Sequence, residues 1–213
     1  MNAFYQMDSA VIVTHPLAQI HLTVMRRTET TCSDFRWHLH RLAEILFMEA
    51  SRGLETASIK IQTPLAETDG QDFARPIVLV PILRAGLGLQ DAILPLVPEA
   101  TVAHIGIARD EETAQPMPYY AKLPSVLNEA DVFLLDPMLA TGGSACAAAS
   151  QLKEAGAKRL VLVCVVSCPP GLQAFTAMHP DVPVYTAAVD QGLNDRCFIV
   201  PGLGDAGDRC FGT

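Results

Sequence analysis

The chain has 213 residues, half of them hydrophobic, and a formal net charge of −8 at pH 7. This length and composition predict one domain with a sizeable core, spanning residues 1–213. The acidic balance, without any run of basic residues, argues against a surface that binds nucleic acid. No apolar run approaches the ~20 residues of a membrane span, and no signal peptide is recognisable, so we expect a cytoplasmic protein with reduced thiols.

In chain order, the first predicted element is an amphipathic helix over residues 33–52. Its apolar residues recur at helical spacing, Ser33 is a candidate N-cap, and Gly53 is a candidate stop after the last turn. His38 and His40 lie two residues apart on this helix and therefore face different sides. They cannot form a metal-binding pair with each other.

Short apolar strands then alternate with helices. We predict strands at residues 76–82, 101–107, 132–135, 159–166 and 184–189, and helices at 88–97, 143–155 and 171–178. This alternation predicts an α/β fold with a mostly parallel sheet flanked by helices, in which ligands bind at the C-terminal ends of the strands. The segment from residue 62 to residue 74 contains no usable motif.

The most informative segment is residues 132–144. Four apolar residues end in Asp136, and a Thr-Gly-Gly-Ser turn at 141–144 leads into an alanine-rich helix. The turn's backbone N–H groups and the helix dipole suit a phosphate, and the Asp136 carboxylate can accept hydrogen bonds from two hydroxyls. No lysine follows the glycines, so a nucleoside triphosphate loop is disfavoured.

A second glycine-rich string, Gly-Leu-Gly-Asp-Ala-Gly at residues 202–207, matches the spacing of a dinucleotide-binding loop. It lies so close to the C-terminus that we expect no helix or strand after it. We therefore interpret the match as accidental. We expect this tail to be held in place by packing of Phe198, Ile199, Val200 and Phe211.

The run Asp-Pro-Met-Leu-Ala-Thr-Gly-Gly-Ser at 136–144 resembles the signature of the uracil phosphoribosyltransferases. Pro137 stands where other phosphoribosyltransferases have a second acid, and this departure is shared by the uracil branch. The resemblance extends over nearly the whole chain. It implies the type I phosphoribosyltransferase fold, a C-terminal base-binding segment and a flap over the site at residues 107–120.

The resemblance implies that uracil and 5-phospho-α-D-ribose 1-diphosphate (PRPP) are converted to UMP and diphosphate. Mg²⁺ is implied as the cofactor, bound mainly through PRPP, with no metal site formed by the protein alone. A homodimer or larger homo-oligomer is implied, with GTP as an effector in some members, and neither nucleic acid nor a membrane is an expected partner. Two alternatives from another class are an RNA-binding regulator and a non-catalytic nucleotide sensor on the same fold.

The same resemblance implies roles for individual residues. Asp136, Arg109 and Asp205 are the catalytic candidates, and Arg84 and Arg109 are expected on the pyrophosphate group. Taken alone, Arg84 is equally consistent with a solvated arginine at the start of a helix. The remaining candidates for PRPP binding are Pro137, Met138, Leu139, Ala140, Thr141, Gly142, Gly143 and Ser144.

Uracil is expected at Ile199, Gly204, Asp205 and Ala206, mainly through backbone groups. Uracil offers an acceptor, a donor and an acceptor along one edge, which backbone N–H and C=O groups can complement.

The six cysteines show neither disulfide nor zinc spacing. We expect Cys164 to be a small buried hydrophobic residue and Cys146 to pack within its helix.

Overall fold

The computed structural model describes residues 4–7, 10–109 and 116–213. Within them, ten strands form one sheet in the order β1-β2-β12-β11-β9-β5-β7-β8, with β10 beside β11 and β6 beside β5. The strands are β1 (Phe4–Met7), β2 (Ala10–Val13), β5 (Ile77–Leu83), β6 (Thr101–Val102), β7 (His104–Arg109), β8 (Pro116–Lys122), β9 (Asp131–Leu135), β10 (Met138–Leu139), β11 (Arg159–Ser167) and β12 (Val184–Val189).

The sheet is parallel from β2 to β7, and only its edge strands β1 and β8 pair antiparallel with their neighbours. The predicted mostly parallel sheet is thereby confirmed. The strand predicted at residues 101–107 is divided, because Ala103 interrupts it between β6 and β7. β6 pairs with the first half of β5, whereas β7 pairs with its end.

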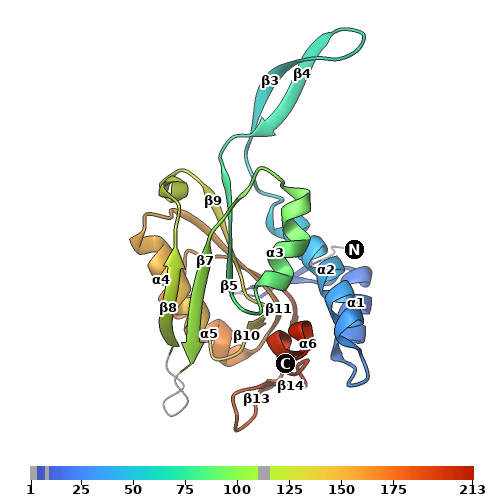
Figure 1. The fold of residues 1–213 in the computed structure, drawn as a ribbon, viewed down its shortest axis with the longest axis vertical. Coiled ribbons are helices and arrows are strands. Elements are labelled where there is room, and N and C mark those ends of the chain that lie inside the picture. The colour runs from blue at the N-terminus through green and yellow to red at the C-terminus, as the bar shows by residue number, and fades with distance from the viewer. Residues whose placement is uncertain (1–3, 8–9, 110–115) are drawn as a thin grey trace.

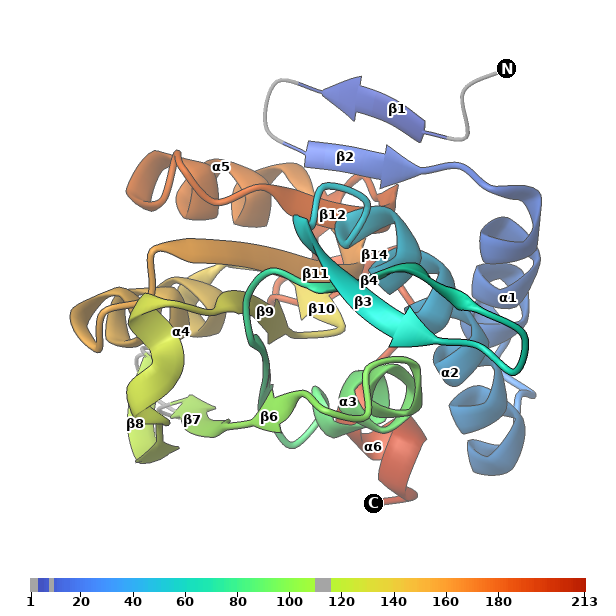
Figure 2. The same ribbon diagram turned by 90° about the horizontal axis from the view of Figure 1, so that it is seen from above.

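Helices cover both faces of the sheet (Figure 2). Helices α4 (Gly143–Glu154) and α5 (Pro169–Met178) lie on one face, and α1 (Pro16–Arg26), α2 (Cys32–Ala50) and α3 (Leu87–Ile93) lie on the other. The short helix α6 (Ala206–Phe211) packs beside α2, and the 3₁₀ helices are η1 (Leu94–Leu96) and η2 (Ser125–Asn128). In the described part of the chain, no helix has the length and apolarity needed to cross a membrane.

The central strands are buried on both faces because apolar residues occupy every position. In β5, Ile77 and Leu79 belong to the core under α1, α2 and α3, whereas Val78 and Val80 belong to the core under α4 and α5. Strand β9 alternates in the same way. Burial on both faces explains the continuous apolar runs in the sequence and holds the strand ends at fixed positions.

Two details of α2 differ from the prediction. Its N-cap is Thr31, whose hydroxyl accepts a hydrogen bond from the N–H of Asp34 at 3.2 Å, so the helix starts before Ser33. It ends at Ala50 with Ser51 as C-cap, which makes the proposed stop at Gly53 wrong. His38 and His40 do face different sides, and His38 meets His21 of α1 with their Nδ1 atoms 2.9 Å apart.

The segment without a motif, residues 62–74, forms the turn and second strand of an antiparallel hairpin of β3 (Thr56–Gln62) and β4 (Glu67–Phe73). The hairpin projects from the end of the molecule opposite the C-terminal segment (Figure 1). All residues of both strands are exposed except the partly buried Gly70. Strand β3 does alternate, with Ala57, Ile59 and Ile61 apolar between polar residues, and this signal was missed. Strand β4 is polar almost throughout and shows no alternation.

Candidate active site

A cleft of about 270 Å³ opens where β5 and β9 end, and strand β14 (Ile199–Val200) and helix α6 lie across it (Figure 1). Asp136 directly follows β9 and Arg84 directly follows β5, so the parallel sheet brings both to one place, as predicted. The described residues that line the cleft are Ile82, Leu83, Arg84, Ala85, Ile107, Asp136, Met138, Ala140, Ser144, Arg196, Cys197, Phe198, Ile199, Gly204, Asp205, Ala206 and Gly207.

Asp136 is fixed by the strand beside it. Its N–H donates to the carbonyl of Val163 in β11 at 3.2 Å, and its Oδ1 accepts from the N–H of Met138 at 3.3 Å. The residue is partly buried. A carboxylate held in this way faces the cleft with little freedom to reorient.

The Thr-Gly-Gly-Ser turn has the predicted form of a glycine turn before a helix. Gly142 adopts a left-handed conformation (φ +85°) as N-cap of α4, a conformation that favours glycine. The N–H of Gly143 points toward Thr141 Oγ1, 3.5 Å away. The amino end of the twelve-residue helix α4 therefore begins in the turn, with no acidic residue in its first helical turn.

In the run from 137 to 144, Thr141, Gly142 and Gly143 are not among the described residues that line the cleft, and the other five form two groups. Met138, Ala140 and Ser144 line the cleft. Pro137 and Leu139 are buried beneath it, and the Pro137 carbonyl accepts hydrogen bonds from two consecutive N–H groups of β11. The first group can contact a ligand, while the second fixes the loop to the sheet.

Sequence reasoning missed a support behind this loop, formed by Cys168 and Gly171 at the start of α5. The Cys168 thiol donates to the carbonyl of Ala140 at 3.2 Å, and burial raises the pKa of that thiol, which keeps it protonated as a donor. A Cβ atom on Gly171 would lie 2.4 Å from the Leu139 oxygen. Only glycine permits so close an approach of α5 to the loop.

On the opposite side of the cleft, Arg84 contacts the C-terminal segment. Its Nη2 lies 3.3 Å from Asp208 Oδ1, and its Nη1 lies 3.5 Å from Thr213 Oγ1. Asp205 is exposed and caps α6, because its Oδ1 accepts from the N–H of Asp208 at 2.9 Å. The expected ligand-binding side chains Arg84 and Asp205 thus share Asp208 as a neighbour.

The tail is packed, as predicted, but partly through other residues, since Leu203, Ala206 and Cys210 are buried in the core. Ile199 is buried, but Phe198, Val200 and Phe211 are each about two-fifths exposed. Arginines add polar contacts: Arg209 donates to the carbonyls of Leu203, Met25 and Arg27, and Arg36 donates to that of Cys210. The glycine-rich string is followed by a helix after all, since α6 starts at Ala206, although no strand follows it.

Of the residues expected to contact a base, Ile199, Gly204, Asp205 and Ala206 all line the cleft. Gly204 adopts φ +80°, a conformation that favours glycine. Sequence reasoning missed the neighbouring Arg196 and Cys197, which line the cleft from the turn between β13 (Gly192–Leu193) and β14. Cys197 is non-glycine at φ +60°, for which the sequence gives no signal.

The predicted flap is described only at its two ends. β7 and β8 are the extended segments that it joins, and Ile107 lines the cleft. Arg109 is the last residue of β7, while residues 110–115 lie outside the described residues. The role of Arg109 stays a prediction.

Comparison with known proteins agrees with this geometry. The family model described as uracil phosphoribosyltransferase matches residues 11–213. The chain belongs to this family. A uracil phosphoribosyltransferase of Salinibacter ruber is 49% identical over 207 residues, covering 97% of this chain and 99% of the relative. One of Streptococcus agalactiae is 49% identical over 203 residues, covering 95% and 97%.

Solved structures support the fold of a uracil phosphoribosyltransferase. The AQ2163 protein of Aquifex aeolicus superposes with a TM-score of 0.91 at 33% identity, covering 95% of this chain and 97% of that one. An adenine phosphoribosyltransferase of Trypanosoma brucei superposes with a TM-score of 0.56 at 14% identity, covering 88% and 85%. The second comparison shows that this chain and the adenine phosphoribosyltransferase have the same type I fold.

Members of the phosphoribosyltransferase class use Mg²⁺ with their phosphorylated donor, and the residues of this cleft fit that arrangement. Asp136 and Asp205 supply carboxylate oxygens, the ligands that Mg²⁺ prefers. Among the described residues, no group of three or more His, Cys, Asp or Glu side chains could hold a metal ion. Asp136 and Asp205 could each offer a ligand to an Mg²⁺ ion that also binds phosphate oxygens.

Proposed function

We propose that this protein transfers the phosphoribosyl group of PRPP to uracil, giving UMP and diphosphate. The bond between the anomeric carbon and the pyrophosphate oxygen breaks, a bond from that carbon to N1 of uracil forms, and N1 loses its proton. One observation carries the proposal: Asp136, Ser144 at the start of α4, and Ile199, Gly204 and Ala206 of the C-terminal segment line the same cleft.

The donor half of the cleft suits a ribose 5-phosphate. The Asp136 carboxylate can accept hydrogen bonds from the two ribose hydroxyls. The turn at residues 141–144 and the amino end of α4 present backbone N–H groups to the 5′-phosphate. Arg84 offers a planar fork of donors to the pyrophosphate, whose charge grows as it leaves.

The acceptor half suits a pyrimidine. Gly204 and Ala206 bring backbone close to the cleft, and the buried Ile199 holds the strand beneath the base. Backbone groups that complement the edge of uracil are left unpaired by cytosine, and such a mismatch discriminates by roughly 10⁴. No covalent nucleophile is needed, because positioning and charge stabilisation account for the reaction.

When bound with PRPP, Mg²⁺ supplies positive charge that neutralises the pyrophosphate. Asp136 and Asp205 are the residues that would contact it, directly or through water. The chain's own contribution is to hold the two substrates in register and, through the flap between β7 and β8, to exclude water that would hydrolyse the donor.

The test is to mix the purified protein with labelled uracil, PRPP and Mg²⁺ and to follow UMP and diphosphate, with cytosine and adenine as competing bases. We expect equal amounts of the two products from uracil and none from cytosine or adenine. Binding of PRPP or UMP without turnover would indicate a nucleotide sensor and overturn the proposal. Preferential turnover of another base would overturn the substrate assignment.

A further inference from the structure

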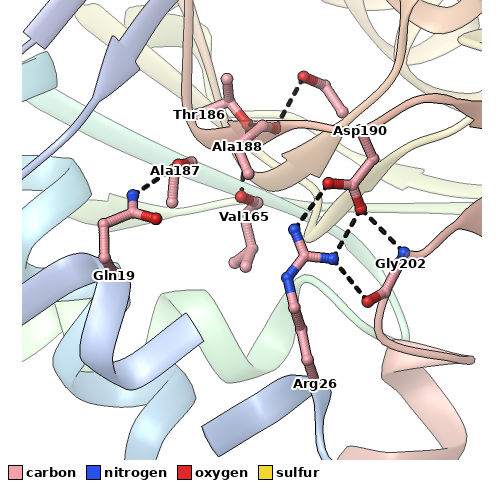
Figure 3. A network of polar contacts seen from close by, with 9 residues as sticks. Gln19, Arg26, Val165, Thr186, Ala187, Ala188, Asp190 and Gly202 are labelled. Carbon is pink, nitrogen blue, oxygen red and sulfur yellow. Dashed lines mark hydrogen bonds and ion pairs between the residues drawn. The ribbon is translucent and has the colours of Figure 1, made fainter. Parts of the chain in front are cut away.

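Arg26 and Asp190 form the most complete polar contact outside the cleft (Figure 3). Arg26 is the last residue of α1, and Asp190 directly follows β12. Arg26 Nη1 donates to Asp190 Oδ2 and Arg26 Nη2 donates to Asp190 Oδ1, each at 2.7 Å. The Asp190 side chain is only 7% exposed and that of Arg26 24% exposed. A bidentate pair with this geometry is more rigid than an ordinary surface ion pair.

The same pair holds the backbone of Gly202 at both its polar groups. Arg26 Nη1 donates to the Gly202 carbonyl at 2.7 Å, and the Gly202 N–H donates to Asp190 Oδ2 at 2.8 Å (Figure 3). Gly202 adopts φ +59°, and a Cβ atom there would lie 2.1 Å from the Ile199 oxygen. The turn therefore has one shape, and the ion pair fixes where it lies.

Gly202 lies between Ile199 and Gly204, which line the acceptor half of the cleft. Arg26, Asp190 and Gly202 are not among the described residues that line it. The pair consequently contacts residues 199–206 at Gly202, on the side that does not line the cleft. It connects that segment to α1 and to the end of β12, whereas the phosphate turn is held by hydrogen bonds to β11 and α5 that involve neither side chain of the pair. The N–H of Asp190 donates to the carbonyl of Ser167 of β11 at 2.8 Å, a contact made by the backbone alone.

We propose that Arg26 and Asp190 are positioning residues for the pyrimidine, which hold residues 199–206 so that their backbone groups meet the base. This inference rests on the proposed function. It predicts that disturbing the pair weakens use of uracil while use of PRPP is retained, because the two halves of the cleft have separate supports. A residue needed only for folding would affect both substrates alike.

The test compares Arg26→Lys and Asp190→Asn with wild type. Lysine keeps the charge but cannot make the bidentate pair and the contact to Gly202 together, and asparagine keeps the shape without the charge. We expect KM for uracil to rise at least tenfold, about 1.4 kcal/mol, with KM for PRPP within about twofold. In the double variant, KM for uracil should be no higher than in the more damaged of the two single variants, because both substitutions break the same contact between Arg26, Asp190 and Gly202.

Arg159→Lys is the matched control. Arg159 starts β11 and forms an ion pair with Asp131 at 3.2 Å, at the opposite end of the parallel strands. This variant should keep both KM values. Equal rises in both KM values for Arg26→Lys and Asp190→Asn, loss of folding in both, or no change in either would overturn the proposal.

Hydrogen exchange separates this inference from the proposed function. In the ligand-free protein, amides of residues 199–206 should exchange faster in Arg26→Lys than in wild type and Arg159→Lys, with residues 136–144 unchanged. This readout needs no turnover. If wild type fails to use uracil while the exchange pattern is as expected, the proposed function fails and the role toward the pyrimidine fails with it, although the pair still fixes residues 199–206. If wild type uses uracil and exchange in Arg26→Lys is unchanged, the positioning role alone is overturned.

Discussion

Arg84, which lines the cleft, forms an ion pair with Asp208 of α6, with Nη2 and Oδ1 3.3 Å apart. Their side chains are 56% and 50% exposed, so the pair contributes only about 0–1 kcal/mol. A pyrophosphate group can replace the carboxylate at small cost. Arg84 thus lines the cleft with a carboxylate partner that holds it only weakly, as the proposed pyrophosphate contact requires.

We therefore expect opposite results from the two partners. Arg84→Gln should raise KM for PRPP at least tenfold, since charge-assisted hydrogen bonds are worth about 1.5–3 kcal/mol each. Asp208→Asn should leave that KM within about threefold or lower it, because it removes a competitor. Steady-state kinetics with varied PRPP measure both. Similar damage from both variants would show that the ion pair itself supports the site.

Asp136→Asn tests the ribose contact. The amide keeps the shape but loses the charge that accepts two hydroxyl hydrogen bonds. At about 1.5–3 kcal/mol for each such bond, kcat/KM for PRPP should fall ten- to a hundredfold or more. The melting temperature, measured alongside, should stay near that of wild type. Wild-type kinetics in this variant would contradict the assigned role.

Gly204→Val tests the base-binding segment. Gly204 has φ +80°, where a side chain costs about 1–2 kcal/mol, and its Cβ would also lie 3.4 Å from Arg209 Cδ. Calorimetry should show near-normal affinity for PRPP and lost affinity for uracil in its presence. Equal loss of both ligands would indicate a collapsed fold. Unchanged uracil affinity would place the base elsewhere.

Gly171→Ala tests the support behind the phosphate turn. Its Cβ would meet the Leu139 oxygen at 2.4 Å, so the loop or α5 has to move. Such overpacking costs about 1–3 kcal/mol, and PRPP affinity should fall together with the melting temperature. Gly53→Ala is the control, because nothing lies within 4 Å of its Cβ. Equal PRPP affinity and melting temperature in the two variants would show that the close approach of Gly171 to Leu139 supports neither property.

Thiol labelling tests the environment of the cysteines. Burial raises the pKa of Cys146, Cys168 and Cys210, and that of Cys164 to about 12. These four should resist N-ethylmaleimide at pH 7.5, since the thiolate is the reactive form. The partly buried Cys32 and Cys197 should react. UMP should protect Cys197, which lines the cleft, but not Cys32. If UMP protects neither cysteine, the base does not bind beside Cys197.

The sequence by itself determined the parts whose causes are local. The apolar run before Asp136, the glycines of the following turn and the helix start at Gly143 are adjacent in the chain, so the donor half of the site was predictable. Strands buried on both faces gave continuous apolar runs, and the parallel sheet followed from them. The predicted and observed bounds of β12 coincide for this reason.

Only the tertiary structure decided how the acceptor half is held. Arg26 lies 164 residues from Asp190 and 176 from Gly202, and Arg209 lies 182 residues from Arg27. Each of these arginines would be equally typical of a solvated surface. The sequence likewise did not predict that arginine hydrogen bonds add to the packing of the tail, in which Phe198 and Phe211 remain two-fifths exposed. Hydrogen bonds between distant segments leave no periodicity in a sequence, because their geometry exists only after the sheet and helices have brought the partners together.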